Sequence, residues 1–155
     1  MLGSMWIDQR GSEVLPRTEC LRLVAVTAKE HAVGRLGVPT DGSPIIVPVN
    51  FSYLDSAVII RLGPGTVANG AVGRLVSFEV DRVDMEVQRG WSVLVRGLAL
   101  ALEPHELHRR WRHLPEPLVP TPGDLLLSIR ADVVTGRRFS IGRPRCGAPQ
   151  DRSEG

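Results

Sequence analysis

The pattern of hydrophobic and polar positions changes its period along the chain. Over residues 16–27 the apolar side chains recur at helical spacing, and Pro16 suits the first turn because the N–H that it lacks would have no partner there. A second helix is expected over residues 104–113. From residue 33 onward, apolar and polar residues mostly alternate, which is typical of strands that bury one face.

The alternating segments predict six strands. Their expected bounds are 33–38, 45–51, 57–62, 74–83, 91–102 and 124–135. Asp41-Gly42 predicts a hairpin turn, a second turn is expected over 53–56, and a short helical turn is expected over 67–72. Six strands and two short helices, mostly joined by hairpins, predict a mainly β chain that forms a small closed or split β-barrel.

A chain of 155 residues is most simply one domain. We expect a flexible N-terminal arm over residues 1–15, the barrel over 16–140 and a tail over 141–155. The tail is rich in Pro, Arg and Gly, a composition that favours disorder.

The composition argues against several classes of function. A formal net charge of +2 and seven aromatic residues do not favour nucleic-acid binding. Two cysteines and four histidines show no spacing typical of a metal site, so the histidines are interpreted as solvated. The longest apolar run, 98–102, is too short to span a membrane, and the first residues lack the apolar core of a signal peptide. A soluble cytoplasmic protein is therefore expected.

Candidate binding chemistry gathers where two neighbouring strands end. Asn50 lies near the end of one expected strand, and Arg61 lies near the end of the next. The loop of residues 63–66 follows, with two glycines whose N–H groups can approach an anion closely. Because a guanidinium presents a fork of donors that matches phosphate oxygens, this stretch is where the phosphate of a cofactor would be expected.

Several segments together resemble a known family. They are TECLRL, VGRLGVPTDGSPIIVPVNF, VIIRLGPGT, VSFEVD, GWSVLVRGLAL and VTGRRF, between residues 18 and 139. In order and spacing they resemble the FMN-binding split barrels of the pyridoxamine 5′-phosphate oxidase family, and they look most like its short bacterial members, which include nitroimidazole-resistance reductases. The resemblance implies a homodimer with a flavin in the groove between two barrels.

The resemblance also implies roles for particular residues. One strand end would run beside the flavin ring, an arginine and a loop would bind the phosphate, and the start of the fifth strand would wall the site. The residues concerned are, in that order, Pro48, Val49 and Asn50; Arg61, Gly65 and Thr66; Trp91 and Ser92. The flavin would carry the redox chemistry, so no protein residue is expected to be a catalytic acid or base.

Alternatives stay open at this stage. Val67 stands where the family usually has a lysine, so a deazaflavin coenzyme, or no cofactor at all, is an alternative to FMN. The implied function is a flavin-dependent oxidoreductase acting on an unidentified small molecule. The alternative is a non-catalytic barrel that binds a flavin or deazaflavin, or no cofactor. The same residues also have purely structural interpretations. Arg61 is then a surface arginine, Asn50 caps a turn, and the side chain of Trp91 fills the barrel interior.

Overall fold

The computed structural model describes residues 12–103, 105–106, 112, 114–115 and 123–141. Its helices are α1 (Arg17–Ala28) and α2 (Thr66–Ala71). The strands, in chain order, are β1 (Glu13–Val14), β2 (Val33–Val38), β3 (Ile45–Leu54), β4 (Ala57–Leu62), β5 (Leu75–Asp84), β6 (Arg89–Ala101), β7 (Leu125–Arg130) and β8 (Val133–Ser140).

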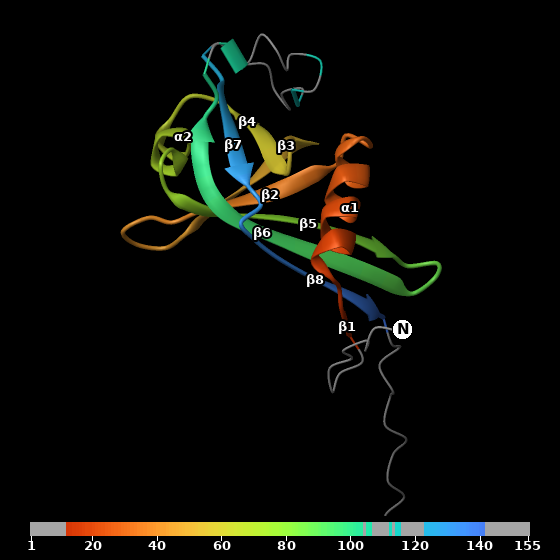
Figure 1. The fold of residues 1–155 in the computed structure, drawn as a ribbon. Coiled ribbons are helices and arrows are strands. Elements are labelled where there is room, and N and C mark those ends of the chain that lie inside the picture. The colour runs from red at the N-terminus through yellow and green to blue at the C-terminus, as the bar shows by residue number, and fades with distance from the viewer. Residues whose placement is uncertain (1–11, 104, 107–111, 113, 116–122, 142–155) are drawn as a thin grey trace, which may run out of the picture.

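Six of the strands close into an antiparallel barrel. Neighbours follow the order β6–β5–β2–β3–β4–β7, and β7 pairs with β6 again to complete the ring. β8 lies outside this ring along the first part of β6, and β1 pairs with β8 (Figure 1). The predicted mainly β barrel is therefore confirmed, and the first predicted helix is confirmed with a shift of one residue at each end.

The predicted strand over residues 124–135 is wrong. This segment is two strands, β7 and β8, with a bend at Ala131 and Asp132 between them. The chain changes its position on β6 at this bend, since β7 pairs with 99–101 and β8 pairs with 89–96. The hydrophobic alternation continues across the bend, and for that reason it gave no sign of the break.

Gly97 lies on β6 between the parts that pair with β7 and with β8. A Cβ built at this position would lie 1.9 Å from the carbonyl oxygen of Arg130, so only glycine lets the end of β7 approach β6 this closely.

The hairpin between β3 and β4 is tight. Asp55 and Ser56 both have positive φ, 50° and 61°, as the two central residues of a type I′ turn do. This turn sets the register of the two strands, which pairs Phe51 with Ile60 and Ser52 with Ile59.

The main core fills the barrel and extends beneath α1. Leu36 and Phe78 are fully buried, and the Phe78 ring meets the Phe51 ring edge to face at a centroid distance of 4.8 Å. α1 packs against β3, β6 and β8 (Figure 1). Cys20 of α1 is buried, and a Cβ at Gly136 of β8 would approach its Sγ to 2.6 Å, so helix and strand pack closely there.

Two predicted segments are only partly covered by the described residues. Most of the second predicted helix, 104–113, lies outside them, as does residue 142 onward of the predicted tail. Of the predicted arm, residues 1–11 lie outside them, whereas Glu13 and Val14 form β1. No helix in the described part of the chain has the length and apolar character needed to cross a membrane.

Candidate functional site

The two faces of β4 separate cleanly. Val58, Ile60 and Leu62 point into the main core, and Ala57 and Ile59 belong to a second apolar cluster on the outside of the barrel. Arg61 lies between Ile60 and Leu62, so alternation places it on the outer face. The strand that carries Arg61 lies between β3 and β7, and Arg61 pairs with Leu126 of the second cluster.

Asn50 and Ser52 belong to the same outer face. They alternate on β3 with Val49 and Phe51, which are buried in the main core. The register of β3 and β4 pairs Phe51 with Ile60, and continuing it by one residue sets Asn50 opposite Arg61. The structure thus brings together two of the residues that the sequence analysis selected.

Three polar atoms near this outer face are buried without a hydrogen-bond partner. They are Nε of Arg61, Oγ of Ser52 and Oδ1 of Asp124, the residue that precedes β7. A buried polar group without a partner costs about 1–3 kcal/mol, so a bound water, ion or ligand would find an unused donor or acceptor at each of these atoms. Arg61 and Ser52 supply donors and Asp124 an acceptor.

The other predicted phosphate residues follow directly after β4. Gly65 has a φ of 149°, a conformation that suits glycine, and a Cβ there would meet no atom within 4 Å, so the approach to its backbone is open. Thr66 is the first residue of α2. Val67 is half-buried and packs against the main core.

The remaining predicted residues are placed differently. Val49 is 1% exposed and contributes its side chain to the core, whereas Pro48 is exposed on the outside of β3. Pro48 pairs with Arg35 of β2 and lies outside the stretch of β3 that pairs with β4, as a residue without an N–H requires.

Trp91 and Ser92 lie on β6, between β5 and β8, in a different part of the same chain. Trp91 is half-buried and packs against the main core. Ser92 lines a shallow pocket of about 250 Å³ with Glu79 and Arg137. Burial raises the pKa of Glu79, although the guanidinium of Arg35 donates a hydrogen bond to it at 2.9 Å.

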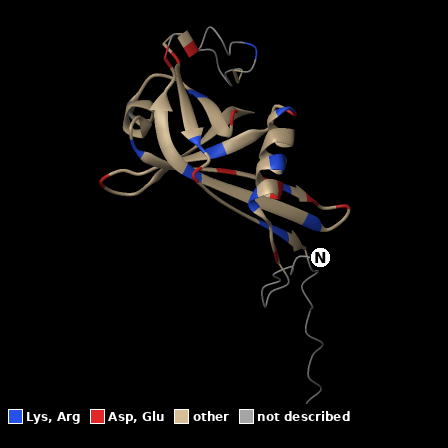
Figure 2. Cartoon of the chain, viewed as in Figure 1, with Lys and Arg blue, Asp and Glu red and all other residues tan. Residues whose placement is uncertain are grey.

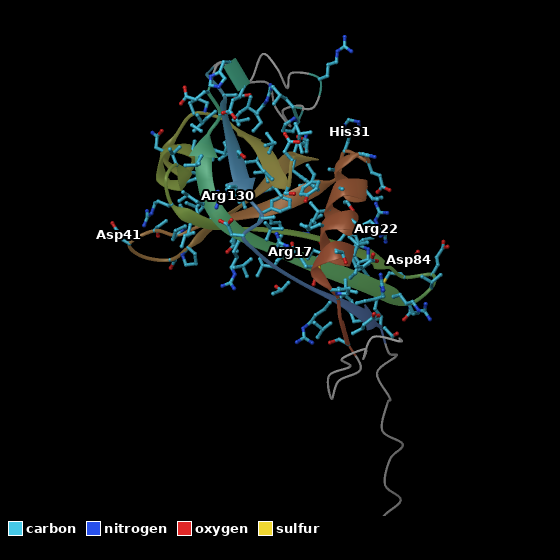
Figure 3. The ribbon with its side chains drawn as sticks, viewed as in Figure 1. Arg17, Arg22, His31, Asp41, Asp84 and Arg130 are labelled. Atoms are coloured by element: carbon cyan, nitrogen blue, oxygen red, sulfur yellow. The ribbon has the colours of Figure 1, made fainter. Side chains whose placement is uncertain are left out.

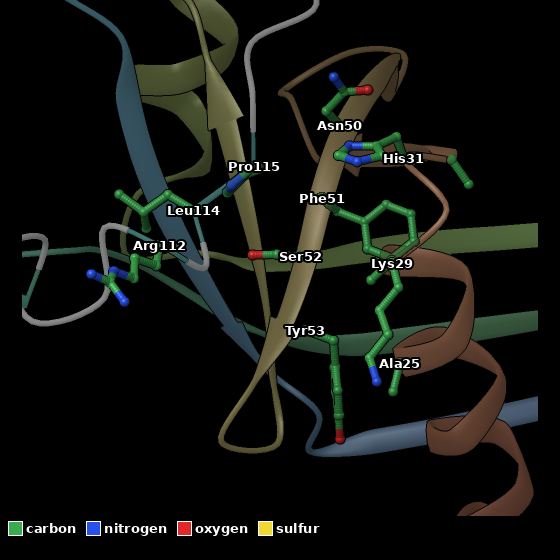
Figure 4. Close-up of a pocket in the computed structure, with 12 residues that line it drawn as sticks. Ala25, Lys29, His31, Asn50, Phe51, Ser52, Tyr53, Arg112, Leu114 and Pro115 are labelled. Carbon is green, nitrogen blue, oxygen red and sulfur yellow. The ribbon is translucent and has the colours of Figure 1, made fainter.

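A larger pocket, of about 320 Å³, lies between the end of α1 and β3, and we call it the α1–β3 pocket (Figure 4). It lies beside the last residues of β3, which extend beyond the end of β2, because β2 pairs with residues 45–50 of β3 only. Its residues come from α1, the turn after it, β3 and the segment near residue 114. They are Ala25, Ala28, Lys29, His31, Ala32, Asn50, Phe51, Ser52, Tyr53, Arg112, Leu114 and Pro115.

Asn50 links the α1–β3 pocket to the outer face of β3 and β4, because it lines this pocket and shares that face with Arg61. Sequence reasoning selected Asn50 but missed Ser52 and Lys29. The spacing of two between Asn50 and Ser52 on a strand could have indicated Ser52. Nothing local indicated Lys29 or His31, which reach the pocket through the packing of α1 against β3.

Charges of both signs are interspersed over the described residues (Figure 2). Figure 3 shows His31 at the C-terminal end of α1, away from Asp41 in the β2–β3 loop and from Asp84 at the end of β5. The described residues contain no group of three or more His, Cys, Asp or Glu side chains that could hold a metal ion.

Comparisons with known proteins agree with this architecture. The family described as pyridoxamine 5′-phosphate oxidase matches residues 16–138. An uncharacterized Mycobacterium tuberculosis protein, Rv0080, is 34% identical over 131 residues, which cover 81% of this chain and 84% of that protein.

Two solved structures are similar over most of their length. The FAD binding protein from Mycobacterium smegmatis has a TM-score of 0.67 and 30% identity, over 82% of this chain and 97% of that one. A FAD-binding protein from Mesorhizobium loti has a TM-score of 0.65 and 26% identity, over 83% of this chain and 99% of that one. With a family match over most of the barrel and relatives of nearly the same length, the chain belongs to the pyridoxamine 5′-phosphate oxidase family.

Proposed function

We propose that this protein binds a flavin on the outer face of β3 and β4 and acts as a flavin-dependent oxidoreductase on a small molecule. The observation that carries the proposal is the buried Nε of Arg61, which has no hydrogen-bond partner. The loop that follows Arg61 contains Gly65, whose backbone is open to approach. Similar solved structures are named as FAD-binding proteins, which supports a flavin in general.

The residues present fit a phosphorylated, hydroxylated cofactor. Arg61 would bind the phosphate through charge-assisted hydrogen bonds, each contributing roughly 1.5–3 kcal/mol. The Gly65 loop would let backbone N–H groups come close to the same anion. The unpartnered Oδ1 of Asp124 would accept a hydrogen bond from a hydroxyl of the cofactor chain. Asn50 would stand beside the ring together with the neighbouring part of β3 that includes Pro48.

When bound, a flavin supplies electron and hydride transfer. The task of this chain's residues is to bind the cofactor, to orient a substrate beside it and to exclude water. Asn50 and Ser52 present an amide and a hydroxyl to that space. The resemblance favours FMN, whereas the names of the solved relatives favour FAD; the chain's own phosphate-binding residues would serve either.

A homodimer is part of the proposal. Large apolar side chains are exposed on the outside of the barrel, with Ile46 at 68% and Leu75 at 72%. Both lie on the outer face of one sheet, because Gly37 of β2 pairs with Ile46 and with Ser77, two residues from Leu75. Covering these side chains in a second copy would remove apolar surface from water, at about 25 cal/mol per Å².

The second candidate function is a non-catalytic binding protein. Val67 favours it, because a half-buried valine stands where the family usually has a cationic residue. A phosphate would then have one positive partner fewer, which favours weaker binding or a different coenzyme.

An absorption spectrum of the purified protein tests the proposal directly. We expect a yellow protein, or a colourless one that quenches the fluorescence of added FMN or FAD and gains thermal stability from it. Titrations with FMN, FAD and a deazaflavin in parallel rank the three cofactors. If none of them binds, the flavin proposal is wrong. If one binds but is not reduced by any nicotinamide or substrate tested, the non-catalytic function is favoured. Light scattering on the same sample reports whether the protein is a dimer.

A further inference from the structure

The sheet formed by β3, β2, β5, β6 and β8 has one side that faces away from the core, and we call it the β2–β5–β6 face. Along β5, Phe78 belongs to the core, so its neighbours Ser77 and Glu79 lie on this outward side. Two register rows cross the face. One contains Ile46, Gly37, Ser77, Arg96 and Val133, and the other contains Pro48, Arg35, Glu79, Leu94 and Thr135.

Large apolar side chains are exposed on the β2–β5–β6 face. Four of them are 44–72% exposed, and they are Val33, Ile46, Leu75 and Val133. Exposed apolar side chains that gather on one surface mark a place where another molecule binds.

Arg96 of β6 is an exposed cation on this face. It lies between Ser77 and Val133 in its row. Asp132 lines the same shallow pocket as Arg96, but its carboxylate pairs with Arg130 at 3.2 Å. Within the part of the chain that the structure describes, the guanidinium of Arg96 therefore has no carboxylate partner.

The neighbouring row has the opposite imbalance. Nη1 of Arg35 donates hydrogen bonds to Oε2 of Glu79 at 2.9 Å and to Oδ1 of Asp81 at 2.6 Å, so one guanidinium faces two carboxylates. Arg137 lines the pocket of about 250 Å³ beside Glu79, and its Nη1 donates to Oγ of Ser12. Burial raises the pKa of Glu79, although Arg35 opposes this. A further cation would stabilise these carboxylates.

A face with these two imbalances is complementary to itself. In a two-fold pair of identical chains, each contact between two positions occurs twice with the roles exchanged. We propose that the β2–β5–β6 face packs on a second copy of this chain, and that Arg96 donates hydrogen bonds to Glu79 and Asp81 of the partner subunit, in both directions. The apolar side chains supply the buried area, and the reciprocal ion pairs select the partner and its orientation. This pairing rests on the proposed homodimer, and it assigns the face and the residues that specify it.

Arg96 and Glu79 are also neighbours within one chain. Arg96 pairs with Ser77, two residues before Glu79, so the two side chains are diagonal neighbours on the face. They nevertheless form no ion pair with each other, because Glu79 is paired with Arg35. An exchange of charges between separate chains distinguishes a contact between subunits from a contact within one chain.

Two single charge reversals are compared with their mixture. In Arg96→Glu alone and in Glu79→Arg alone, every homodimer holds two contacts between like charges, so each variant should dimerise about a hundredfold more weakly than wild type. In an equimolar mixture the heterodimer has two contacts between opposite charges, and dimerisation should return to within about threefold of wild type. Sedimentation equilibrium gives the dissociation constants, and native mass spectrometry identifies the heterodimer by its mass.

Arg89→Glu is the matched control. It makes the same change of charge on β6, at an exposed position that alternation places on the other side of the strand from Arg96, so it should dimerise like wild type. Equal weakening by Arg89→Glu and Arg96→Glu would show a general charge effect and overturn the proposal. Recovery in the mixture also shows that both single variants fold.

Titration of the same samples with FMN keeps the other failures apart. If both single variants dimerise as wild type does, the ion pairs are wrong and the homodimer stands. If the mixture dimerises no better than the single variants, the charges act within one chain and the pairing is overturned. A wild-type chain that stays monomeric refutes the homodimer and this pairing together, whereas flavin binding by that monomer would leave the flavin site standing.

Discussion

Arg138 of β8 joins the last strand to the first helix, because its Nη2 donates a hydrogen bond to Oε1 of Glu19 at 2.9 Å. Nε of Arg22 donates to Oε2 of the same carboxylate at 2.7 Å. Glu19 thus holds two guanidinium groups, one from its own helix and one from a strand 119 positions later in the chain. This hydrogen bond adds a polar link between α1 and β8 to the apolar packing of the helix on the sheet.

Replacement of Glu19 by Gln should lower stability in a pH-dependent manner. The hydrogen bond from Arg22, and then that from Arg138, lower the pKa of Glu19 from 4.5 to about 2. Because the folded-state pKa is below the unfolded one, the stabilisation is complete above about pH 4.5 and is lost as pH falls toward 2. Solvent screening limits it to about 1 kcal/mol at pH 7.

Urea unfolding of wild type and Glu19→Gln at pH 7 and near pH 2 measures this difference. Glu86→Gln, which removes an exposed carboxylate in the β5–β6 hairpin, is the matched control and should have no effect. A difference between wild type and Glu19→Gln that stays constant with pH would contradict the assigned ion pairs.

Gly97→Ala should destabilise the barrel by about 1–3 kcal/mol or more, because the new methyl group would lie 1.9 Å from the carbonyl oxygen of Arg130. The same substitution at Gly42, where a Cβ would meet nothing within 4 Å, should be nearly neutral. Thermal unfolding by circular dichroism compares the two variants. Equal melting temperatures would mean that β7 does not cross β6 at this point.

Phe78→Ala should cost about 3–5 kcal/mol, because it opens a cavity in the centre of the core and removes the edge-to-face contact with Phe51. Val83 is on the same strand but is 47% exposed, so Val83→Ala provides the control. Chemical denaturation of both variants gives the two free energies of unfolding. A loss at Val83 as large as that at Phe78 would contradict the central place of Phe78 in the core.

Arg61→Ala should weaken flavin binding tenfold or more, a change of about 1.4 kcal/mol, because the phosphate loses its guanidinium partner. Arg61→Lys keeps the charge but loses the fork of donors, so an intermediate affinity is expected. Arg74→Ala is the control. Fluorescence titration with FMN measures all three, and an unchanged affinity in Arg61→Ala would remove this arginine from the site.

The local pattern was sufficient for most of the elements. Helical spacing predicted α1, and alternation predicted β2 to β6, because both periods follow from backbone geometry within a few residues. The bend between β7 and β8 could not be predicted in this way. Ala131 and Asp132 carry no glycine or proline signal, and the cause of the bend is the pairing of two segments with different parts of β6.

The sequence by itself determined that the chain is a barrel and that Asn50 and Arg61 lie on adjacent strands. The expected place of Asn50 at a strand end was wrong, because β3 continues to Leu54 before it turns into β4. The tertiary structure decided that these two share an outer face, that Val49 points into the core, and that Ser92 lines a separate pocket. It also placed Lys29, which follows α1, and Ser52 of β3 in the lining of one pocket. The physical reason is that periodicity is a property of neighbouring residues, whereas burial of Arg61 Nε without a partner depends on strands that are distant in the chain.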